Sequence, residues 1–201
     1  VKGKIFNTAQ NTGVEAMYYA LPQPSELESG ASEKYCLMTI HRVETLLNRK
    51  RVKFIAHLAE RMAKTIKVKM VLHDPTRKKL EELGLLYRIS ENQDIETFPL
   101  VPHGEFLGLM SSAEYVITDG GSIQEECYYL DIPCLVLREE TERREGLDSN
   151  VVLAGFDEEA IERFQREYQS HKRGHRTENI QPSRRILDDL LEEMGGCHSR
   201  S

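Results

Sequence analysis

Short apolar runs alternate with longer stretches of helical periodicity from Tyr35 to the end of the chain. Runs of this length that are rich in Val, Ile, Leu and Tyr predict strands, and the stretches between them predict helices. The alternation is typical of βα units, so it predicts a parallel sheet with helices on both faces. The expected strands are Tyr35–Ile40, Val68–Leu72, Asp94–Phe98, Tyr115–Thr118, Cys134–Leu137 and Val151–Leu153.

The clearest helix lies between the first two strands. Apolar residues from Val52 to Ile66 recur at spacings of three and four, while lysines, arginines and Glu60 occupy the other face. This pattern predicts an amphipathic helix with one side packed on the sheet. Further helices are expected at Val14–Leu21, Thr76–Leu83, His103–Ser111, Ser122–Leu130, Glu158–Tyr168 and Ser183–Met194.

Two polar, proline-containing breaks divide the chain. The first, residues 22–34, has the composition of a linker and separates residues 1–21 from the rest. The second begins near residue 170 and is basic and polar. The sequence therefore predicts a Rossmann-like domain over residues 35–169, followed over residues 170–201 by a connector, a terminal helix and a frayed tail.

Composition narrows the possible partners. The chain has 201 residues, of which 39% are apolar and 30% charged, as in an ordinary globular protein. Its net charge of −6 argues against a nucleic-acid partner, whose binding depends on phosphate neutralisation. No apolar run is long enough to span a membrane, and the first residues of the sequence do not have the charged-then-apolar pattern of a secretory signal. The four cysteines show no metal-ligand spacing, so no metal site is expected and a reducing cytoplasm is indicated.

Polar residues follow four of the expected strands. In open parallel sheets, ligands bind beyond the carboxyl ends of the strands, so these positions are the candidates for a site. Each has a simpler structural explanation, because a histidine after a strand is usually a loop residue and the charged run 138–145 could be a solvated loop. The residues concerned are His41-Arg42, His73, the turn from Asp119 to Ser122, and Arg138.

The glycine turn gives the sharpest prediction. Gly120 and Gly121 should allow backbone angles closed to other residues and let an anion approach the main chain. Ser122 adds a hydroxyl, and Glu126 shares its helix face and could accept from a ribose diol. Simpler interpretations remain open: ordinary turn chemistry, Ser122 as a helix N-cap, and Glu126 as a complement to the helix dipole. No GxxxxGK[ST] sequence is present, so a Walker loop is excluded.

Taken together, these residues resemble one family, the non-hydrolysing UDP-N-acetylglucosamine 2-epimerases. The resemblance extends over about residues 5–165 and rests on order and spacing as well as on identity. The matching pieces are His41-Arg42-Val43-Glu44, Leu72-His73 with Arg77-Lys78, Pro99-Leu100 before Phe106, Leu109 and Met110, the run Thr118 to Glu126, and Leu137-Arg138 with Thr141-Glu142-Arg143 and Glu145-Gly146.

The resemblance implies a fold and a set of roles. The fold is the C-terminal, nucleotide-binding half of a two-domain GT-B-type architecture, with residues 1–21 the remnant of the preceding domain. His41 resembles the family's active-site histidine, and Arg42 its neighbour near the phosphates. The remaining roles are a diphosphate cradle at Gly120, Gly121 and Ser122, a ribose ligand at Glu126, a cationic rim at Arg138 and Arg143, and a regulatory UDP-sugar site near His73.

The implied reaction interconverts UDP-N-acetylglucosamine and UDP-N-acetylmannosamine by elimination and re-addition of UDP, without a nicotinamide or other cofactor. The carboxylates that move the proton would belong to the other domain, so this chain is expected to be inactive alone and homodimeric when complete. Departures at Thr45, Ser122, Arg144 and Asp74 suggest a divergent branch. A hydrolysing epimerase, a GT-B-type glycosyltransferase and a nucleotide-sugar-binding module without catalysis remain as alternatives.

Overall fold

A computed structural model of the chain describes residues 5–8, 10–22, 33–147, 149–172 and 181–196. The chain divides into two compact units. One contains residues 22–176, and the other joins residues 1–21 to residues 177–201. The expected linker over residues 22–34, the connector after residue 170 and the terminal tail lie largely outside the described residues. The domain boundaries therefore stay predictions.

The larger unit is built on a six-stranded sheet in the order β3-β2-β1-β4-β5-β6. Every neighbouring pair is parallel, with β1 between β2 and β4. All the expected strands are present, and their ends differ from the expected ones by at most one residue. The strands are β1 Tyr35–Thr39, β2 Lys67–Val71, β3 Ile95–Phe98, β4 Tyr115–Thr118, β5 Cys134–Val136 and β6 Val151–Leu153.

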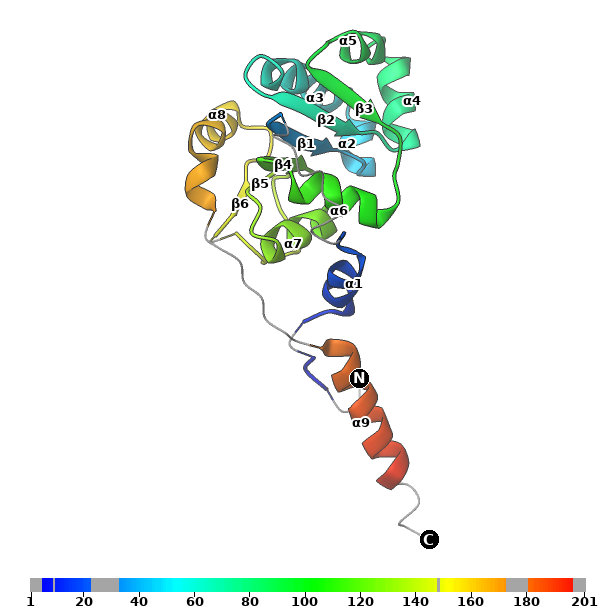
Figure 1. Ribbon diagram of the computed structural model, residues 1–201. Coiled ribbons are helices and arrows are strands. Elements are labelled where there is room, and N and C mark those ends of the chain that lie inside the picture. The colour runs from blue at the N-terminus through cyan, green and yellow to red at the C-terminus, as the bar shows by residue number, and fades with distance from the viewer. Residues whose placement is uncertain (1–4, 9, 23–32, 148, 173–180, 197–201) are drawn as a thin grey trace. The chain divides into compact units, whose positions relative to one another are not determined.

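Helices cover both faces of this sheet (Figure 1). Cys36 and Met38 join a core cluster with residues of α3 and α8. Leu37 between them is also fully buried and, by strand alternation, faces the opposite layer. The helices of this unit are α2 Val43–Leu47, α3 Arg49–Met62, α4 Asp74–Glu82, α5 Leu86–Ser90, α6 His103–Ser111, α7 Gly121–Tyr129 and α8 Glu158–Glu167, followed by the 3₁₀ turn η1 Tyr168–His171.

Two of these helices, α2 and α5, are absent from the sequence prediction. Each has five residues, which is too short for a helical hydrophobic period to be visible. Helix α3 begins directly after α2 because the Asn48 side chain accepts from the backbone amides of Lys50 and Arg51 and caps the new helix. The amphipathic helix expected from Val52 onward therefore begins three residues earlier, at Arg49.

The smaller unit contains helix α1, Thr12–Ala20, and helix α9, Pro182–Gly196. Asn11 caps α1 by accepting from the amide of Gly13, and Glu15 accepts from the amide of Ser183 at 2.9 Å. Leu187, Leu190 and Leu191 on α9 are about half exposed. The hydrogen bond between Glu15 and Ser183 links the N-terminal and C-terminal parts of the chain within this unit.

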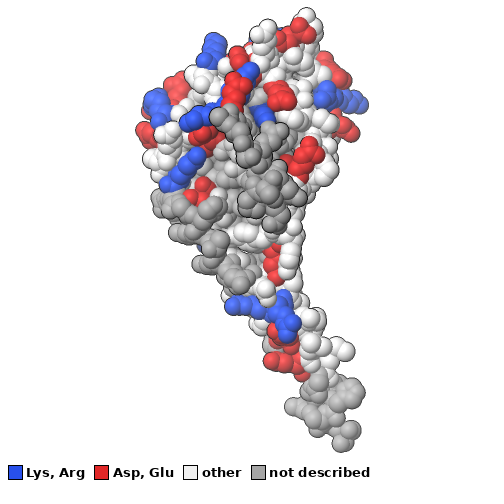
Figure 2. Space-filling model, in the orientation of Figure 1, with Lys and Arg blue, Asp and Glu red and all other residues white. Residues whose placement is uncertain are grey.

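On the surface seen in Figure 2, acidic and basic side chains are interspersed over the described residues. This mixture agrees with the small negative net charge of the sequence. None of the helices within the described ranges is long and apolar enough to cross a bilayer.

Candidate functional site

The candidate residues meet at the carboxyl edge of the sheet. Strands β1 and β4 are neighbours, and the chain order of the strands reverses between them. This reversal is the topological switch point at which open α/β sheets bind ligands. The turn after β1 carries His41 and Arg42, and the turn after β4 carries Asp119 and Gly120.

Asp119 joins these two turns. Its carboxylate is fully buried and accepts from the backbone amides of His41 at 3.0 Å and Arg42 at 3.1 Å. Hydrogen bonds to a charged acceptor are the stronger kind, and they satisfy a carboxylate that could not otherwise remain buried. Sequence reasoning placed Asp119 in the turn but gave it no role, because the partner amides lie about 80 residues away in the chain.

His41 and His73 lie together at the rim. Their rings stack with centroids 4.7 Å apart and planes 15° from parallel. His41 Nδ1 is 3.8 Å from Asp119 Oδ1. Burial, and then the neighbouring His41, lower the pKa of His73 below its ordinary value of 6.5, against weaker opposing effects of Asp119 and Asp74. The structure thus brings together two histidines that the sequence assigned to different roles.

The lowered pKa of His73 predicts a pH-dependent stability. Between the folded and unfolded pKa values the unfolded chain binds more protons, so the free energy of unfolding falls as the pH drops through and below 6.5. In His73→Gln this part of the decline should disappear. Denaturant unfolding at about pH 7.5 and about pH 5.5 measures it. His57→Gln, an exposed substitution on α3, should keep the wild-type decline, and an equally steep decline in His73→Gln would contradict the assignment.

The glycines of the turn are needed for close approach and not for unusual backbone angles. Gly120 is the N-cap of α7 with φ −90° and ψ 129°, which any residue can adopt, so the expectation of special angles is wrong. A Cβ on Gly120 would lie 2.8 Å from His41 Cε1, and one on Gly121 would lie 2.7 Å from Glu142 Oε1. Side chains from two other loops therefore press against the start of this helix.

Ser122 is exposed and is the second residue of α7, so its interpretation as an N-cap is wrong. Helix α7 has nine residues and no side-chain cap at its start. The first amides of a helix have no acceptor within it, so they and the Ser122 hydroxyl can donate to an anion.

Glu126 on α7 has a side-chain partner on another helix. Its Oε1 is 2.9 Å from Nε2 of His103, the first residue of α6. Burial raises the pKa of Glu126 above 4.5, and the hydrogen bond to His103 opposes this effect. Sequence reasoning missed His103. The signal available was its place at the start of the helix after β3, at the same edge of the sheet.

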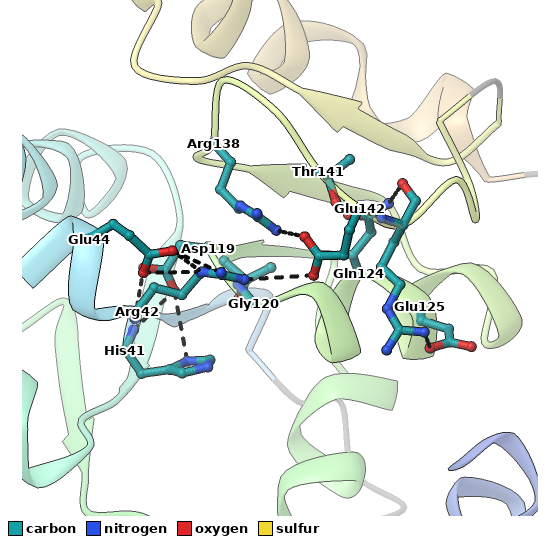
Figure 3. Close-up of polar contacts among 12 residues, drawn as sticks. His41, Arg42, Glu44, Asp119, Gly120, Gln124, Glu125, Arg138, Thr141 and Glu142 are labelled. Carbon is teal, nitrogen blue, oxygen red and sulfur yellow. Dashed lines mark hydrogen bonds and ion pairs between the residues drawn. The ribbon is translucent and has the colours of Figure 1, made fainter. Parts of the chain in front are cut away.

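Arg42 and the two arginines of the predicted rim are each paired with a carboxylate (Figure 3). Arg42 binds Glu44 through Nη2 at 2.9 Å, and Arg138 Nη1 is 2.8 Å from Glu142 Oε2. Glu142 also lies 3.7 Å from Arg42 Nη1, so it links the two arginines. Arg143 pairs instead with Glu125 at 2.8 Å.

Buried Gln124 holds the loop that carries this charged run. Its amide nitrogen donates to the carbonyls of Arg143 at 3.2 Å and Glu145 at 3.0 Å, and its oxygen accepts from the Thr141 hydroxyl at 2.8 Å. Gly146 ends the loop with φ +81°, a left-handed conformation that favours glycine. The run 141–145 is therefore fixed over the start of α7 and is not a free solvated loop.

The assembled edge offers backbone amides, a hydroxyl and arginine side chains from the three connections that follow β1, β4 and β5. These are donors for an anionic ligand of the phosphate type. Among the described residues, no group of His, Cys, Asp and Glu could hold a metal ion. Fold and site together define a Rossmann-like α/β domain with hydrogen-bond donors gathered at its switch point.

Comparison with known proteins gives the family. The family model for UDP-N-acetylglucosamine 2-epimerase matches residues 2–187, and the chain belongs to that family. Over 135 residues, 65% of this chain, it is 43% identical to a UDP-N-acetylglucosamine 2-epimerase of Methanococcus maripaludis and covers 36% of that protein. It is 33% identical to a Methanocaldococcus jannaschii enzyme of the same name, with 64% and 36% covered.

Solved structures give the same result. The Methanocaldococcus jannaschii epimerase, crystallised with UDP-GlcNAc and UDP, matches with a TM-score of 0.72 and 27% identity, over 92% of this chain and 50% of that chain. A heptosyltransferase of E. coli shares the fold with a TM-score of 0.50 at 17% identity, over 72% of this chain and 46% of that one. The predicted Rossmann-like, GT-B-type fold class is confirmed. The chain spans about half the length of these solved proteins and 36% of the curated relatives above.

Proposed function

We propose that this chain is the UDP-binding half of a UDP-N-acetylglucosamine 2-epimerase. The observation that carries the proposal is the Asp119 bridge, which joins His41 and Arg42 to the glycine turn at the switch point. Membership of the family and the likeness to an epimerase structure holding UDP-GlcNAc and UDP support it.

In this proposal the diphosphate lies against Gly120, Gly121 and Ser122. Arg42 and Arg138 stand at the same edge and supply positive charge. Glu126, whose carboxylate is held by His103, accepts from the ribose hydroxyls. Arg143 supports the rim through Glu125, and His73 stacks on His41.

The proposed reaction breaks the bond between the sugar's anomeric carbon and the diphosphate oxygen and removes the proton from carbon 2. Re-addition of UDP and return of a proton to the other face give the epimer. His41 and the cationic rim serve the departing diphosphate, because opposite charge stabilises a leaving anion. Carboxylates that move the carbon 2 proton would come from a domain outside these 201 residues, since general acid–base catalysis needs groups within hydrogen-bond reach.

We further propose that the complete protein is a cytoplasmic homodimer and that the 201-residue chain alone turns over no substrate. The reaction is of the non-hydrolysing type. A hydrolysing epimerase would release free UDP, and a GT-B-type glycosyltransferase would require an acceptor.

Calorimetry with UDP and uridine tests the binding site. We expect the chain to bind UDP at least about tenfold more tightly than uridine, because charge-assisted hydrogen bonds to the diphosphate contribute about 1.5 kcal/mol or more. Raising the salt concentration should lower the affinity for UDP and leave the affinity for uridine unchanged, since only the diphosphate binds through charge. Equal affinities for the two ligands would refute the phosphate cradle.

A further inference from the structure

The Glu142 side chain lies over the start of helix α7. Its Oε1 is 2.7 Å from the position that a Cβ on Gly121 would occupy, so the carboxylate rests against the main chain of the first helical residue. That end of a helix carries partial positive charge and unpaired amides, and it favours an anion. A carboxylate of the protein itself thus lies where the proposed function puts a ligand phosphate.

The same carboxylate also pairs with two arginine side chains of the site. Glu142 is 2.8 Å from Arg138 Nη1 and 3.7 Å from Arg42 Nη1, and Figure 3 shows it reaching toward both side chains. Its own backbone amide, and then Arg138, lower the pKa of Glu142 below 4.5. Glu142 is therefore ionised at neutral pH and neutralises positive charge that a diphosphate would need.

Glu142 can leave this position without a rearrangement of its loop. Its side chain is 57% exposed. The residues on either side of it, Thr141 and Arg143, are held by Gln124 through a hydroxyl and a carbonyl. Rotation of one exposed side chain, with the backbone unchanged, would free Arg138 and the start of α7.

We propose that Glu142 is a built-in competitor for the ligand's diphosphate, which must displace it from Arg138 and from the start of α7. The proposal rests on the proposed function and extends it to the control of ligand affinity. A planar guanidinium cannot give the same donors to a carboxylate and to a phosphate at once, so binding is an exchange. The cost of displacing Glu142 is the same for every ligand that takes its place, so Glu142 lowers the affinity of each phosphate ligand that reaches Arg138.

The test is calorimetry of UDP, UMP and uridine binding to the 201-residue chain and to Glu142→Gln. We expect UDP affinity to rise about three- to tenfold in the variant, the range that loss of one or two exposed ion-pair contacts implies. UMP affinity should rise by the same factor or by a smaller one, because no ligand can gain more than the free energy it spends on displacing Glu142. Uridine affinity should not change, because uridine has no phosphate to compete.

Glu139→Gln is the matched control. Glu139 lies on the same loop, is 73% exposed and pairs with Arg51 at 2.6 Å, so the substitution removes the same charge from a different contact. UDP affinity should stay at the wild-type value in this variant. An equal rise in both variants would show a general charge effect and would overturn the proposal.

The outcome separates this proposal from the proposed function. If the wild-type chain prefers UDP to uridine and Glu142→Gln binds UDP equally or more weakly, then Glu142 is not a competitor, while the phosphate site stands. If neither protein prefers UDP to uridine, both proposals fail. A rise in UDP affinity confined to Glu142→Gln supports both.

Discussion

Replacement of Asp119 by alanine is expected to lower the free energy of unfolding by about 3 to 5 kcal/mol. The carboxylate is fully buried, and its loss leaves the amides of His41 and Arg42 without their acceptor. UDP affinity should fall at least about tenfold, because the two turns that the carboxylate joins would no longer be fixed relative to each other. Denaturant unfolding followed by circular dichroism, together with calorimetry below the unfolding transition, measures both effects.

Asp157→Ala is the control for this prediction. Asp157 caps α8, accepts from one amide, that of Glu159 at 3.2 Å, and is exposed. Loss of such a cap costs about 1 kcal/mol, and UDP affinity should not change. If Asp119→Ala lowered the free energy of unfolding no more than Asp157→Ala, the Asp119 hydrogen bonds would not be what holds the two turns together.

Replacement of Gln124 by leucine is expected to cost about 2 to 4 kcal/mol and to weaken UDP binding about tenfold. The substitution keeps the volume and removes the three hydrogen bonds that hold residues 141–145 over α7. Without them the loop should no longer keep Arg143 and its neighbours at the rim. Unfolding and UDP calorimetry measure the two effects, with exposed Gln169→Leu as the control that changes neither.

A double-mutant cycle with Thr141→Val separates the hydroxyl contact from the rest. The Thr141 hydroxyl donates to Gln124 Oε1 at 2.8 Å, so the two substitutions should be non-additive by at least about 0.5 kcal/mol. Strict additivity would mean that the contact does not stabilise the loop.

The sequence predicted the sheet well because its signals are local. The strands are short runs rich in apolar residues, and polar residues follow four of the six expected ones, so these strands and their carboxyl ends are visible in the chain. The two short helices α2 and α5 gave no such signal. Their five residues hold too few apolar positions to define a helical face.

The site was harder to predict because its partners are distant in sequence. The approximate positions of His41, Gly120 and Arg138 followed from the strands alone. That Asp119 accepts from the turn after β1, that Glu126 meets His103, and that Glu142 lies over Gly121 depends on which strands and loops become neighbours. The special backbone angles expected of the glycines were wrong, and their role as a phosphate cradle stays a prediction.

The Asp119 bridge also has a consequence for the order of folding. It spans 77 and 78 residues and forms only after β4 has paired with β1. Pairing over such a sequence distance carries a loop-closure entropy cost, so it is expected to form late, after local βα units have formed. A nascent or refolding chain that ends before β4 can therefore contain three paired strands and still lack the Asp119 bridge. Under the proposed function, nucleotide binding would measure the fraction of molecules in which β4 has paired with β1, whereas helix content would not.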